Sequence, residues 1–497
     1  MDKDTASIPS FGTPDPENLF LASAEGLYSY HQLNRYRTYL MHRLQDFDIS
    51  GSRPVGFVAN SCDELVMAVA SCWKSGLPFA CFNPSSPAQE LQAQITELNP
   101  ALLITQGDLP LSPEKLPPVL SIQELSLENA FRNEPGDSTV SPGFSFDPDP
   151  DQVFGYFFTS GTSSSAKIVP LRRRQMLFAA RASARNFRPD SNHFWLLCLP
   201  LNHVGGISII IRSLLYGSGI YRMKKFDEQM VGTFLSENKL FQAASLVPTM
   251  LKRLIDIPAF RTHPTFKAIL LGGGPISTAL LERAVAKGVP VVASYGMTET
   301  CAQIAANPLL KPSGTYIPRK SVGPIFEPND IQIRDEGGTP VKGNTPGLIW
   351  LKGPQVFDGY LNKDLTRQRF DEHGWFNTGD FGYLNGNRHL FIESRRSDLI
   401  ITGGENVSPY EVEEQLERLE TIRRAAVTGI PDEEWGERVV AAVVVEKGAP
   451  FDPEAIREKL EQRLIAYKIP KQILAVGELP TNRTGKVIRS ELPSLFK

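Results

Sequence analysis

Cysteines and long apolar runs are scarce in this chain of 497 residues. The five cysteines form no C-x-x-C pair. An odd set of isolated cysteines argues against a disulfide framework or a zinc site and favours a reducing compartment. No apolar run reaches the length of about 18 residues needed to span a bilayer, and the N-terminus has no basic stretch followed by an apolar segment. We therefore expect a cytoplasmic protein with no transmembrane segment.

An excess of positive charge is also absent. The formal net charge is −3, from 52 basic and 55 acidic residues. We therefore expect no general nucleic-acid binding. The local basic cluster Arg172-Arg173-Arg174 is expected to be a solvated helix start. The hydrophobic content of 41% is typical of a folded protein, and the length suggests roughly three domains.

Two common nucleotide-binding motifs are missing as well. No G-x-x-x-x-G-K-[ST] loop is present, because the nearest match ends in Gly485-Lys486-Val487, without a final Ser or Thr. The dinucleotide fingerprint fails too, since Gly272-Gly273-Gly274 is followed by Ser277 where the last glycine should stand. Any nucleotide must therefore be held by another kind of loop.

A hydroxyl-rich segment, Thr159-Ser-Gly-Thr-Ser-Ser-Ser-Ala-Lys167, is a candidate for such a loop. Eight small residues in a row, six of them with a hydroxyl, follow an apolar run at 153–158 and end at the lysine. Backbone N–H groups, hydroxyls and a lysine can together hold a polyphosphate. A flexible surface loop is the alternative, because Ser/Thr/Gly runs are common in such loops.

Helical and strand patterns alternate through the N-terminal part of the chain. This β–α–β rhythm predicts a parallel sheet covered by helices. It begins again after residue 153, with strands at 195–199, 268–271 and 289–293 and an apolar helix at 206–215. The first expected helices are 27–49, 63–74 and 90–98, and the first expected strands are 55–60, 79–82 and 101–105.

The pattern changes after about residue 320. Short alternating runs separated by Gly and Pro predict an antiparallel, barrel-like unit. A compact α+β stretch follows residue 398. We therefore expect an α/β fold in two domains. Residues 1–394 form a large N-terminal domain of stacked βα sheets plus a small β-barrel-like unit, and residues 395–497 form a small α+β C-terminal domain.

Two further motifs lead to a family resemblance. Ser294-Tyr-Gly-Met-Thr-Glu299 comes directly after an apolar strand, and open α/β sheets bind ligands at the carboxyl ends of their strands. Trp375-Phe-Asn-Thr-Gly-Asp380 ends in a carboxylate. With the hydroxyl-rich segment, and in the same order, these motifs resemble the adenylate-forming superfamily of acyl- and aryl-CoA ligases, luciferases and peptide-synthetase adenylation domains. The resemblance covers nearly the whole chain.

The resemblance implies a phosphate loop and a metal ligand. Ser164 and Ala166 stand where the family usually has Gly and Pro. Thr298 would touch the α-phosphate of ATP and act in catalysis. Glu299 would hold Mg²⁺, a hard cation that prefers oxygen ligands. The phosphate-binding residues would be Thr159, Ser160, Gly161, Thr162, Ser163 and Lys167.

The resemblance also implies how the rest of the nucleotide is held. Tyr295 would pack on adenine, beside Gly296. Asp380 would accept hydrogen bonds from the ribose hydroxyls, which suits a carboxylate with two acceptor oxygens. Arg395 would reach the nucleotide as well. The glycine pair Gly273 and Gly274 completes the expected nucleotide-binding residues.

The C-terminal motifs resemble those of a domain that rotates between two half-reactions. The segment 394–398 looks like the hinge, with Ser397 or Asp398 as its pivot. Gly403 and Gly404 would meet the arm of coenzyme A after rotation. The terminal motif places Lys486 as the catalytic cation of adenylation. The small C-terminal domain is therefore expected to be mobile and to carry the catalytic lysine.

The implied activity is an AMP-forming ligation of a carboxylic acid to coenzyme A, with ATP, Mg²⁺ and coenzyme A as cofactors or co-substrates. Segments 199–217, 245–250, 270–275 and 395–406 look most like the o-succinylbenzoate–CoA ligase branch of menaquinone or phylloquinone synthesis. In this branch the substrate keeps a second, charged carboxylate.

The second carboxylate of such an acid needs a partner, because a buried carboxylate requires a cation or several donors. Arg212 lies in an apolar helix and, with Ser208 or Thr249, would bind it. A surface position or a structural ion pair is an equally good reading of Arg212. His203 would line or gate the acyl site, or else be a satisfied core histidine.

Other functions remain open at this point. A ligase for coumarate-like or medium-chain acids is one alternative, and an apolar acyl pocket without a cation would favour it. A protein that charges a carrier protein instead of coenzyme A is a second, and a nucleotide-binding regulator is a third. The sequence leaves open whether the chain is a monomer or a homodimer.

Overall fold

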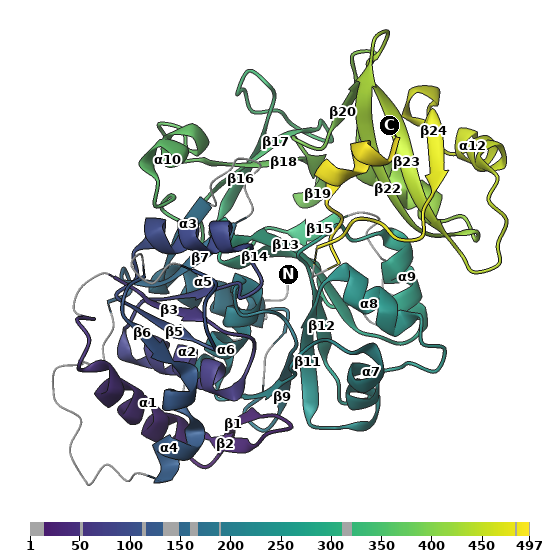
Figure 1. The fold of residues 1–497 in the computed structure, drawn as a ribbon. Helices are drawn as coiled ribbons and strands as arrows, with labels where there is room; N and C mark the ends of the chain where they lie inside the picture. Colours follow the sequence, from purple (N-terminus) through teal and green to yellow (C-terminus); the bar gives the residue numbers. More distant parts are fainter. Residues whose placement is uncertain are drawn as a thin grey trace, which may run out of the picture.

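The computed structural model describes residues 14–49, 53–111, 116–132, 149–159, 167–187, 190–310, 321–482 and 485–496 (Figure 1). The strands form four sheets. Two of them build the N-terminal part together with the helices around them, and the other two follow along the chain. No helix in the described ranges combines the length and the apolar character that crossing a bilayer requires.

The first sheet has six strands in the order β6-β5-β3-β4-β7-β8. Its pairs are parallel except for the hairpin β7–β8. The central strands are buried along their whole length, as is typical of a sheet with both faces covered. The strands are β3 (Val55–Val58), β4 (Phe79–Phe82), β5 (Leu102–Thr105), β6 (Val119–Ser121), β7 (Val153–Thr159) and β8 (Lys167–Arg172).

The second sheet has eight strands in the order β14-β13-β12-β11-β9-β10-β1-β2. Its two outermost pairs, β13–β14 and β1–β2, are antiparallel and the others are parallel. The strands are β1 (Leu19–Ala22), β2 (Leu27–Ser29), β9 (Phe194–Leu197), β10 (Gly219–Arg222), β11 (Phe241–Leu246), β12 (Ala268–Leu271), β13 (Val291–Met297) and β14 (Ala302–Ala306).

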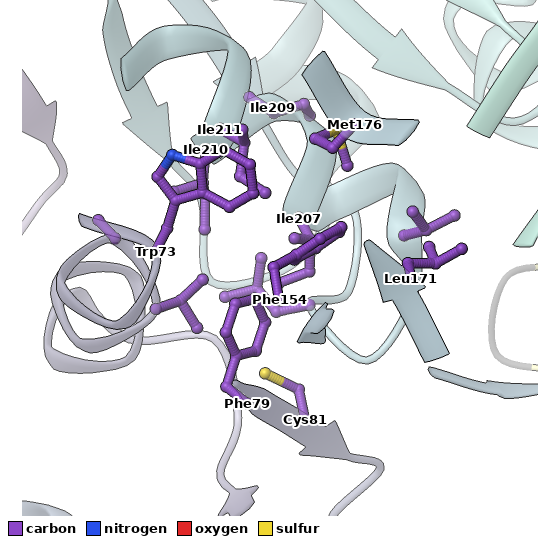
Figure 2. Packing of buried hydrophobic residues seen from close by; sticks show 14 of the residues in the cluster. Trp73, Phe79, Cys81, Phe154, Leu171, Met176, Ile207, Ile209, Ile210 and Ile211 are labelled. Atoms are coloured by element: carbon purple, nitrogen blue, oxygen red, sulfur yellow. The ribbon is translucent and has the colours of Figure 1, made fainter. Parts of the chain in front are cut away.

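The largest core lies between these two sheets. Helices α2 (Asp63–Ser75), α5 (Arg173–Ala184) and α6 (Val204–Tyr216) pack there. Helix α6 is apolar on almost every side, which is typical of a helix enclosed by protein. Figure 2 shows Ile207 and Ile209–Ile211 of this helix close to aromatic side chains of α2 and the first sheet. The other helices of this part are α1 (Tyr30–Leu44), α3 (Ala88–Leu98), α4 (Leu127–Arg132), α7 (Glu228–Glu237), α8 (Pro248–Ile255) and α9 (Thr278–Ala286).

The expected barrel-like unit is a five-stranded antiparallel sheet in the order β15-β19-β18-β17-β16. It carries one short helix, α10 (Lys363–Arg369). Its strands are β15 (Ser321–Pro324), β16 (Asp330–Arg334), β17 (Gly347–Lys352), β18 (Phe376–Leu384) and β19 (His389–Arg395).

The C-terminal stretch has its own sheet and its own apolar clusters. Its centre is the long hairpin of β22 (Ile422–Asp432) and β23 (Gly436–Val445), and β24 (Gln472–Ala475) lies parallel to β23. The remaining elements are β20 (Ile400–Thr402), β21 (Glu405–Val407), α11 (Pro409–Glu417), α12 (Pro453–Glu461) and the terminal 3₁₀ helix η5 (Arg489–Phe496). The expected α/β class, with a large mainly parallel N-terminal part and a smaller C-terminal one, is confirmed.

Two local expectations were wrong. The helix expected from residue 27 begins at Tyr30, because Ser29 caps it in a reciprocal pair of hydrogen bonds with Gln32. The cluster at 172–174 is not fully solvated, since Arg173 is buried. Its guanidinium lies 3.9 Å from the ring centroid of Trp73 and donates a hydrogen bond of 2.8 Å to the Trp73 carbonyl, which compensates its burial.

Candidate active site

Tyr295 and Arg395, which come from two different sheets, both contact the carboxylate of Asp380. Tyr295, near the end of β13, donates a hydrogen bond of 2.6 Å from its hydroxyl to Asp380 Oδ2. Arg395, the last residue of β19, lies opposite Asp380 in the β18–β19 ladder, and its Nε is 3.2 Å from Asp380 Oδ1. The fold thus brings together three residues that the motifs assign to the nucleotide.

The Asp380 carboxylate is desolvated and compensated by its neighbours. Burial raises its pKa, while Arg395, the Tyr295 hydroxyl and Lys486 act in the opposite direction. Burial alone would lower the pKa of Arg395, but Asp380 and other nearby groups raise it above its ordinary value. A fixed, buried acceptor with two oxygens is suited to a pair of vicinal hydroxyls.

The turn after β13 has no room for larger side chains. A Cβ atom on Gly296 would lie 1.9 Å from the carbonyl oxygen of Ala302. The turn continues as a short 3₁₀ helix, Thr298–Thr300, and the Thr300 hydroxyl accepts a hydrogen bond of 2.9 Å from the Met297 N–H. The backbone of Thr298 and Glu299 is therefore held in one conformation at the carboxyl end of the strand.

Glu299 is held from two sides by a loop of the third sheet. Its carbonyl accepts a hydrogen bond of 2.8 Å from the N–H of Phe357, and its Oε1 accepts one of 2.8 Å from the hydroxyl of Tyr360. Burial raises the pKa of Tyr360 above its ordinary range, so that the hydroxyl remains a donor. Tyr360 thereby fixes the orientation of the carboxylate.

The base of the hydroxyl-rich segment lies next to this pair. Thr159 and Lys167 face each other across the β7–β8 hairpin. The Nζ of Lys167 is 5.8 Å from the centroid of the Tyr360 ring. Burial lowers the pKa of Lys167, and the charges of Arg369 and Arg395 lower it further. The predicted phosphate ligands Ser160, Gly161, Thr162 and Ser163 lie outside the described residues.

Lys486 is placed at the same site from the far end of the chain. Its backbone N–H donates a 2.9 Å hydrogen bond to Asn482 Oδ1, within a tight turn. Burial lowers its pKa, as does the charge of Arg395, whereas Asp398 and Asp380 raise it. Lys486 is itself an exposed residue, and the tail brings its charge within electrostatic range of Asp380 and Arg395.

The two predicted glycine pairs lie in different places. Gly273 has a φ of 77° just after β12, and Cβ atoms on Gly273 and Gly274 would lie 3.4 and 3.5 Å from Val247 and Pro248. These glycines therefore border the start of α8. Gly403 and Gly404 form the β20–β21 turn in the C-terminal part, where Gly403 packs against Trp435.

Arg212 is buried in the interior, with 3% of its surface exposed. Within the described part of the chain, its Nε and Nη2 are buried without a hydrogen-bond partner. The guanidinium lies 5.6 Å from the ring centroid of Trp195. Burial lowers its pKa to about 10, although Tyr216 and Cys301 act in the opposite direction. The surface position considered for this residue is therefore wrong.

Ser208 lies on the same helix as Arg212, and His203 lies immediately before the first residue of that helix. Ser208 is one turn before Arg212, so the two share a helix face, and its hydroxyl donates a 2.8 Å hydrogen bond to the Gly205 carbonyl. His203 precedes the first residue of α6 and is an exposed residue. The surrounding protein still lowers its pKa by desolvation. The alternative of a core histidine is therefore wrong.

Two family models match the chain. The model described as AMP-binding enzyme matches residues 12–361, and the model described as AMP-binding enzyme C-terminal domain matches residues 411–486. The chain belongs to the AMP-binding enzyme family. This AMP-binding enzyme is 33% identical to a 2-succinylbenzoate–CoA ligase of Oceanobacillus iheyensis, over 88% of each protein. It is 31% identical to the protein of that name in Bacillus licheniformis, over 96% of this chain and 97% of the relative.

Solved structures of similar proteins have the same fold. The o-succinylbenzoate CoA synthetase (MenE) of Bacillus subtilis, in complex with the acyl-adenylate intermediate OSB-AMP, matches 96% of this chain with a TM-score of 0.82 and 28% identity. The same B. subtilis enzyme has also been solved in complex with ATP and magnesium ion. ATP-bound MatB from Rhodopseudomonas palustris matches 97% of the chain with a TM-score of 0.86 and 25% identity.

The residues of this AMP-binding enzyme fit a magnesium ion that is shared with a nucleotide. The described ranges contain no group of three or more His, Cys, Asp or Glu side chains suited to a metal. Mg²⁺ usually takes one or two carboxylates and completes its shell with waters and substrate phosphates. Glu299 fits that role, because the Tyr360 hydroxyl occupies Oε1 and not Oε2.

Two residues at the site did not emerge from the sequence. Tyr360 stands in an ordinary-looking loop, Asp358-Gly-Tyr-Leu-Asn362, and only the fold places it on Glu299. Arg369, at the end of α10, lies where a Cβ on Gly379 would come within 2.9 Å of its Nη1, and its charge reaches Lys167. A tyrosine or an arginine near a helix can have many structural roles, so neither residue could be assigned to the site from the sequence alone.

Proposed function

We propose that this AMP-binding enzyme is an AMP-forming acid–CoA ligase that activates o-succinylbenzoate for menaquinone or phylloquinone synthesis. Relatives at 33% and 31% identity are named 2-succinylbenzoate–CoA ligases and align along most of the chain. The B. subtilis synthetase of similar fold was solved with an acyl-adenylate and with ATP and magnesium ion. The cluster of Tyr295, Asp380, Arg395 and Lys486 supports the same chemistry.

The first half-reaction joins two anions, the substrate carboxylate and the α-phosphate of ATP. Catalysis must therefore neutralise charge and align the attack, and it needs no covalent nucleophile. Lys486 supplies a positive charge, and Thr298 contacts the α-phosphate. Mg²⁺ held by Glu299 neutralises charge on the phosphates as a Lewis acid. The departing pyrophosphate is held by Lys167 and the hydroxyl-rich segment.

The remaining residues position the nucleotide and the thiol substrate. Asp380 accepts the ribose hydroxyls and Tyr295 packs on the adenine, with Gly273, Gly274 and Gly296 giving close backbone approach. The acyl-adenylate must be kept from water. Rotation of residues 395–497 about the hinge then withdraws Lys486, and the turn at Gly403 and Gly404 meets coenzyme A.

The choice of acid rests on the buried, partly unpaired guanidinium of Arg212. A buried guanidinium with Nε and Nη2 unpaired in the described structure is costly unless an anion completes it. Arginine matches a carboxylate with two parallel hydrogen bonds. The benzoate carboxylate of o-succinylbenzoate supplies such an anion, with Ser208 on the same helix face and His203 at the entrance of the acyl site.

A coumarate-like or medium-chain acid is the second candidate. Such acids carry no second carboxylate, so they would leave Arg212 unpaired in an otherwise apolar helix. A carrier-charging enzyme would share the first half-reaction and differ in the thiol that it accepts.

Pyrophosphate release over a panel of acids tests the proposal. The panel holds o-succinylbenzoate, cinnamates, benzoates and fatty acids of six to twelve carbons, each with and without coenzyme A. We expect release that depends on o-succinylbenzoate and a thioester that forms only with coenzyme A. A clear preference for another acid would refute the choice of substrate and leave the reaction class intact. No acid-dependent release with any member would refute the class.

A further inference from the structure

We infer that helix α8 is the seat on which the C-terminal part rests during adenylation, with Thr249 as the residue that positions Lys486. This inference rests on the proposed function, because it concerns how the catalytic cation reaches the α-phosphate. It assigns to Thr249 a role different from substrate binding. A direct contact at Thr249 supports it, together with an electrostatic interaction one turn further along the same helix face.

The first contact joins Thr249 to the glycine next to Lys486. Gly485 has a φ of 79°, in the region that favours glycine. A Cβ atom there would lie 2.7, 3.1 and 3.3 Å from the Oγ1, Cβ and Cγ2 atoms of Thr249. The backbone of the tail thus lies directly on the threonine side chain, and no larger residue fits between them. Since Lys486 is the next residue, Thr249 sets the depth at which the lysine enters the site.

Thr249 is a rigid support for this contact. It is the second residue of α8, directly after Pro248, and a β-branched side chain in a helix has few rotamers. Leu251 and Leu254 of the same helix are fully buried in the core under the second sheet. The start of α8 also borders Gly274, whose added Cβ would lie 3.5 Å from Pro248. The seat therefore lies between the glycine segment after β12 and the tail.

The second observation is electrostatic and lies one turn further along α8, at Lys252, whose Nζ also pairs with Asp256 at the end of the same helix at 3.4 Å. The positive charge of Lys252 acts on Glu417, at the end of α11 in the C-terminal part. Residues 249 and 252 are three apart, so they share a face of the helix. Glu417 also faces Glu413 and Arg424, and Arg424 donates a hydrogen bond of 3.3 Å to the carbonyl of Gly485. The tail turn is thus bonded to β22 through Arg424 and lies against α8 at Thr249, while the end of α11 is within electrostatic range of α8.

These contacts exist only while the C-terminal part holds its present position. A rotation that withdraws Lys486 must separate Gly485 from Thr249 and Glu417 from Lys252. Damage to the seat should therefore impair adenylation and spare thioester formation. A residue that merely stabilised the fold or bound the acid would impair both half-reactions.

The test measures the two half-reactions separately. Thr249→Phe fills the space that the tail occupies, and we expect pyrophosphate release with o-succinylbenzoate to fall at least tenfold. Thioester formation from supplied acyl-adenylate and coenzyme A should stay within twofold of the parent enzyme. Arg253→Phe is the matched control, because Arg253 lies on the same helix and pairs with Glu228 of α7.

Two further variants keep the test decisive if Thr249→Phe does not fold. Gly485→Ala changes only the tail and should give the same split, and Thr249→Ala in the same chain should restore part of the lost adenylation. At a pH of about 8, where Glu417 is ionised, Lys252→Glu and Glu417→Lys should each slow adenylation, and the double exchange should recover part of it.

Three outcomes overturn the inference: equal loss of both half-reactions, no loss in either, or no recovery in the paired variants. They differ from failure of the proposed function, which would appear as missing acid-dependent pyrophosphate release in the parent enzyme.

Discussion

At the residue scale, the site depends on charged groups that the fold removes from water. Asp380 is compensated by Arg395 and Tyr295, whereas the two buried nitrogens of Arg212 have no partner among the described residues. Under the proposed function, this difference separates a residue that shapes the nucleotide site from one that selects the acid.

Arg212→Met should raise the KM for o-succinylbenzoate by about 10- to 100-fold, since a hydrogen bond to a charged group contributes about 1.5–3 kcal/mol. The KM for ATP should change less than about threefold, because Arg212 is not among the residues assigned to the nucleotide. Initial-rate kinetics with each substrate varied will measure both constants. Arg173→Met is a control, because this equally buried arginine pairs with Trp73. Equal shifts in both constants would contradict the assignment.

Tyr360→Phe should raise the Mg²⁺ concentration needed for half-maximal pyrophosphate release by about three- to tenfold. The hydroxyl fixes Glu299 through one hydrogen bond, and such a bond contributes about 1 kcal/mol. Binding of Mn²⁺ with a non-hydrolysable ATP analogue, followed by electron paramagnetic resonance, should weaken in parallel. Tyr383→Phe serves as control, because Tyr383 stacks on Phe391. An unchanged metal requirement would show that Tyr360 does not orient the ligand.

At the element scale, strand ends and helix starts position the functional groups. Tyr295 and Arg395 stand at or near the ends of β13 and β19, where the carboxyl end of a strand opens to a ligand. Helix α8 presents its first turn to the tail, where Thr249 lies against Gly485. The short segments between elements therefore carry the chemistry, and the elements fix their positions.

Glu417 makes the end of α11 sensitive to pH. Burial raises its pKa from 4.5 to about 7, so the ionised form is disfavoured in the folded protein. Because the folded protein favours the protonated carboxyl group, the stabilising contribution of Glu417 is fully present below its ordinary pKa of 4.5. This contribution is lost as the pH rises through about 7. The full difference corresponds to about 3 kcal/mol.

Glu417→Gln should therefore melt at a higher temperature than the parent protein at pH of about 8 and differ little at pH of about 5. The amide oxygen can still accept the hydrogen bond from the Ala425 N–H. Thermal melting of both proteins across this range provides the measurement. Glu420→Gln, on the exposed segment after α11, is the control. A parallel pH dependence in the two proteins would exclude Glu417 as the source.

At the scale of the whole molecule, the active site is assembled from segments that lie far apart in the chain. Lys486 lies close enough to Asp380 and Arg395 for their charges to alter its pKa, although about a hundred residues separate them in sequence. The second sheet, the third sheet and the C-terminal tail each supply part of the site. Under the proposed function, the position of the C-terminal part decides which half-reaction the enzyme can perform.

Lys486→Ala should lower adenylation by about 100- to 1,000-fold, the usual effect of losing one preorganised electrostatic group. Thioester formation from supplied acyl-adenylate should remain largely intact, because the lysine is withdrawn in that step. Lys471→Ala, an exposed lysine of the same part, is the control. Separate assays of the two half-reactions will decide, and a loss of equal size in both would contradict this division of labour.

The sequence predicted much of the fold and part of the site. Apolar runs such as 79–82 and 268–271 became buried parallel strands, because a strand covered on both faces needs apolar side chains throughout. The predicted start of α1 was too early, because the true start at Tyr30 depends on the single capping residue Ser29. Arg173 was expected in solvent because sequence alone does not show that Trp73 lies beneath it. Tyr360 was missed for the same reason.

The sequence by itself determined the α/β class, the order of the motifs and the residue types suited to phosphate, ribose and a hard cation. These depend on local periodicity and on the chemistry of single side chains. Only the tertiary structure decided that Arg212 is buried with unpaired nitrogens, that Tyr360 holds Glu299 and that Thr249 supports Gly485. Each of these depends on contacts between segments distant in sequence, and such contacts follow from how the sheets and the C-terminal part pack.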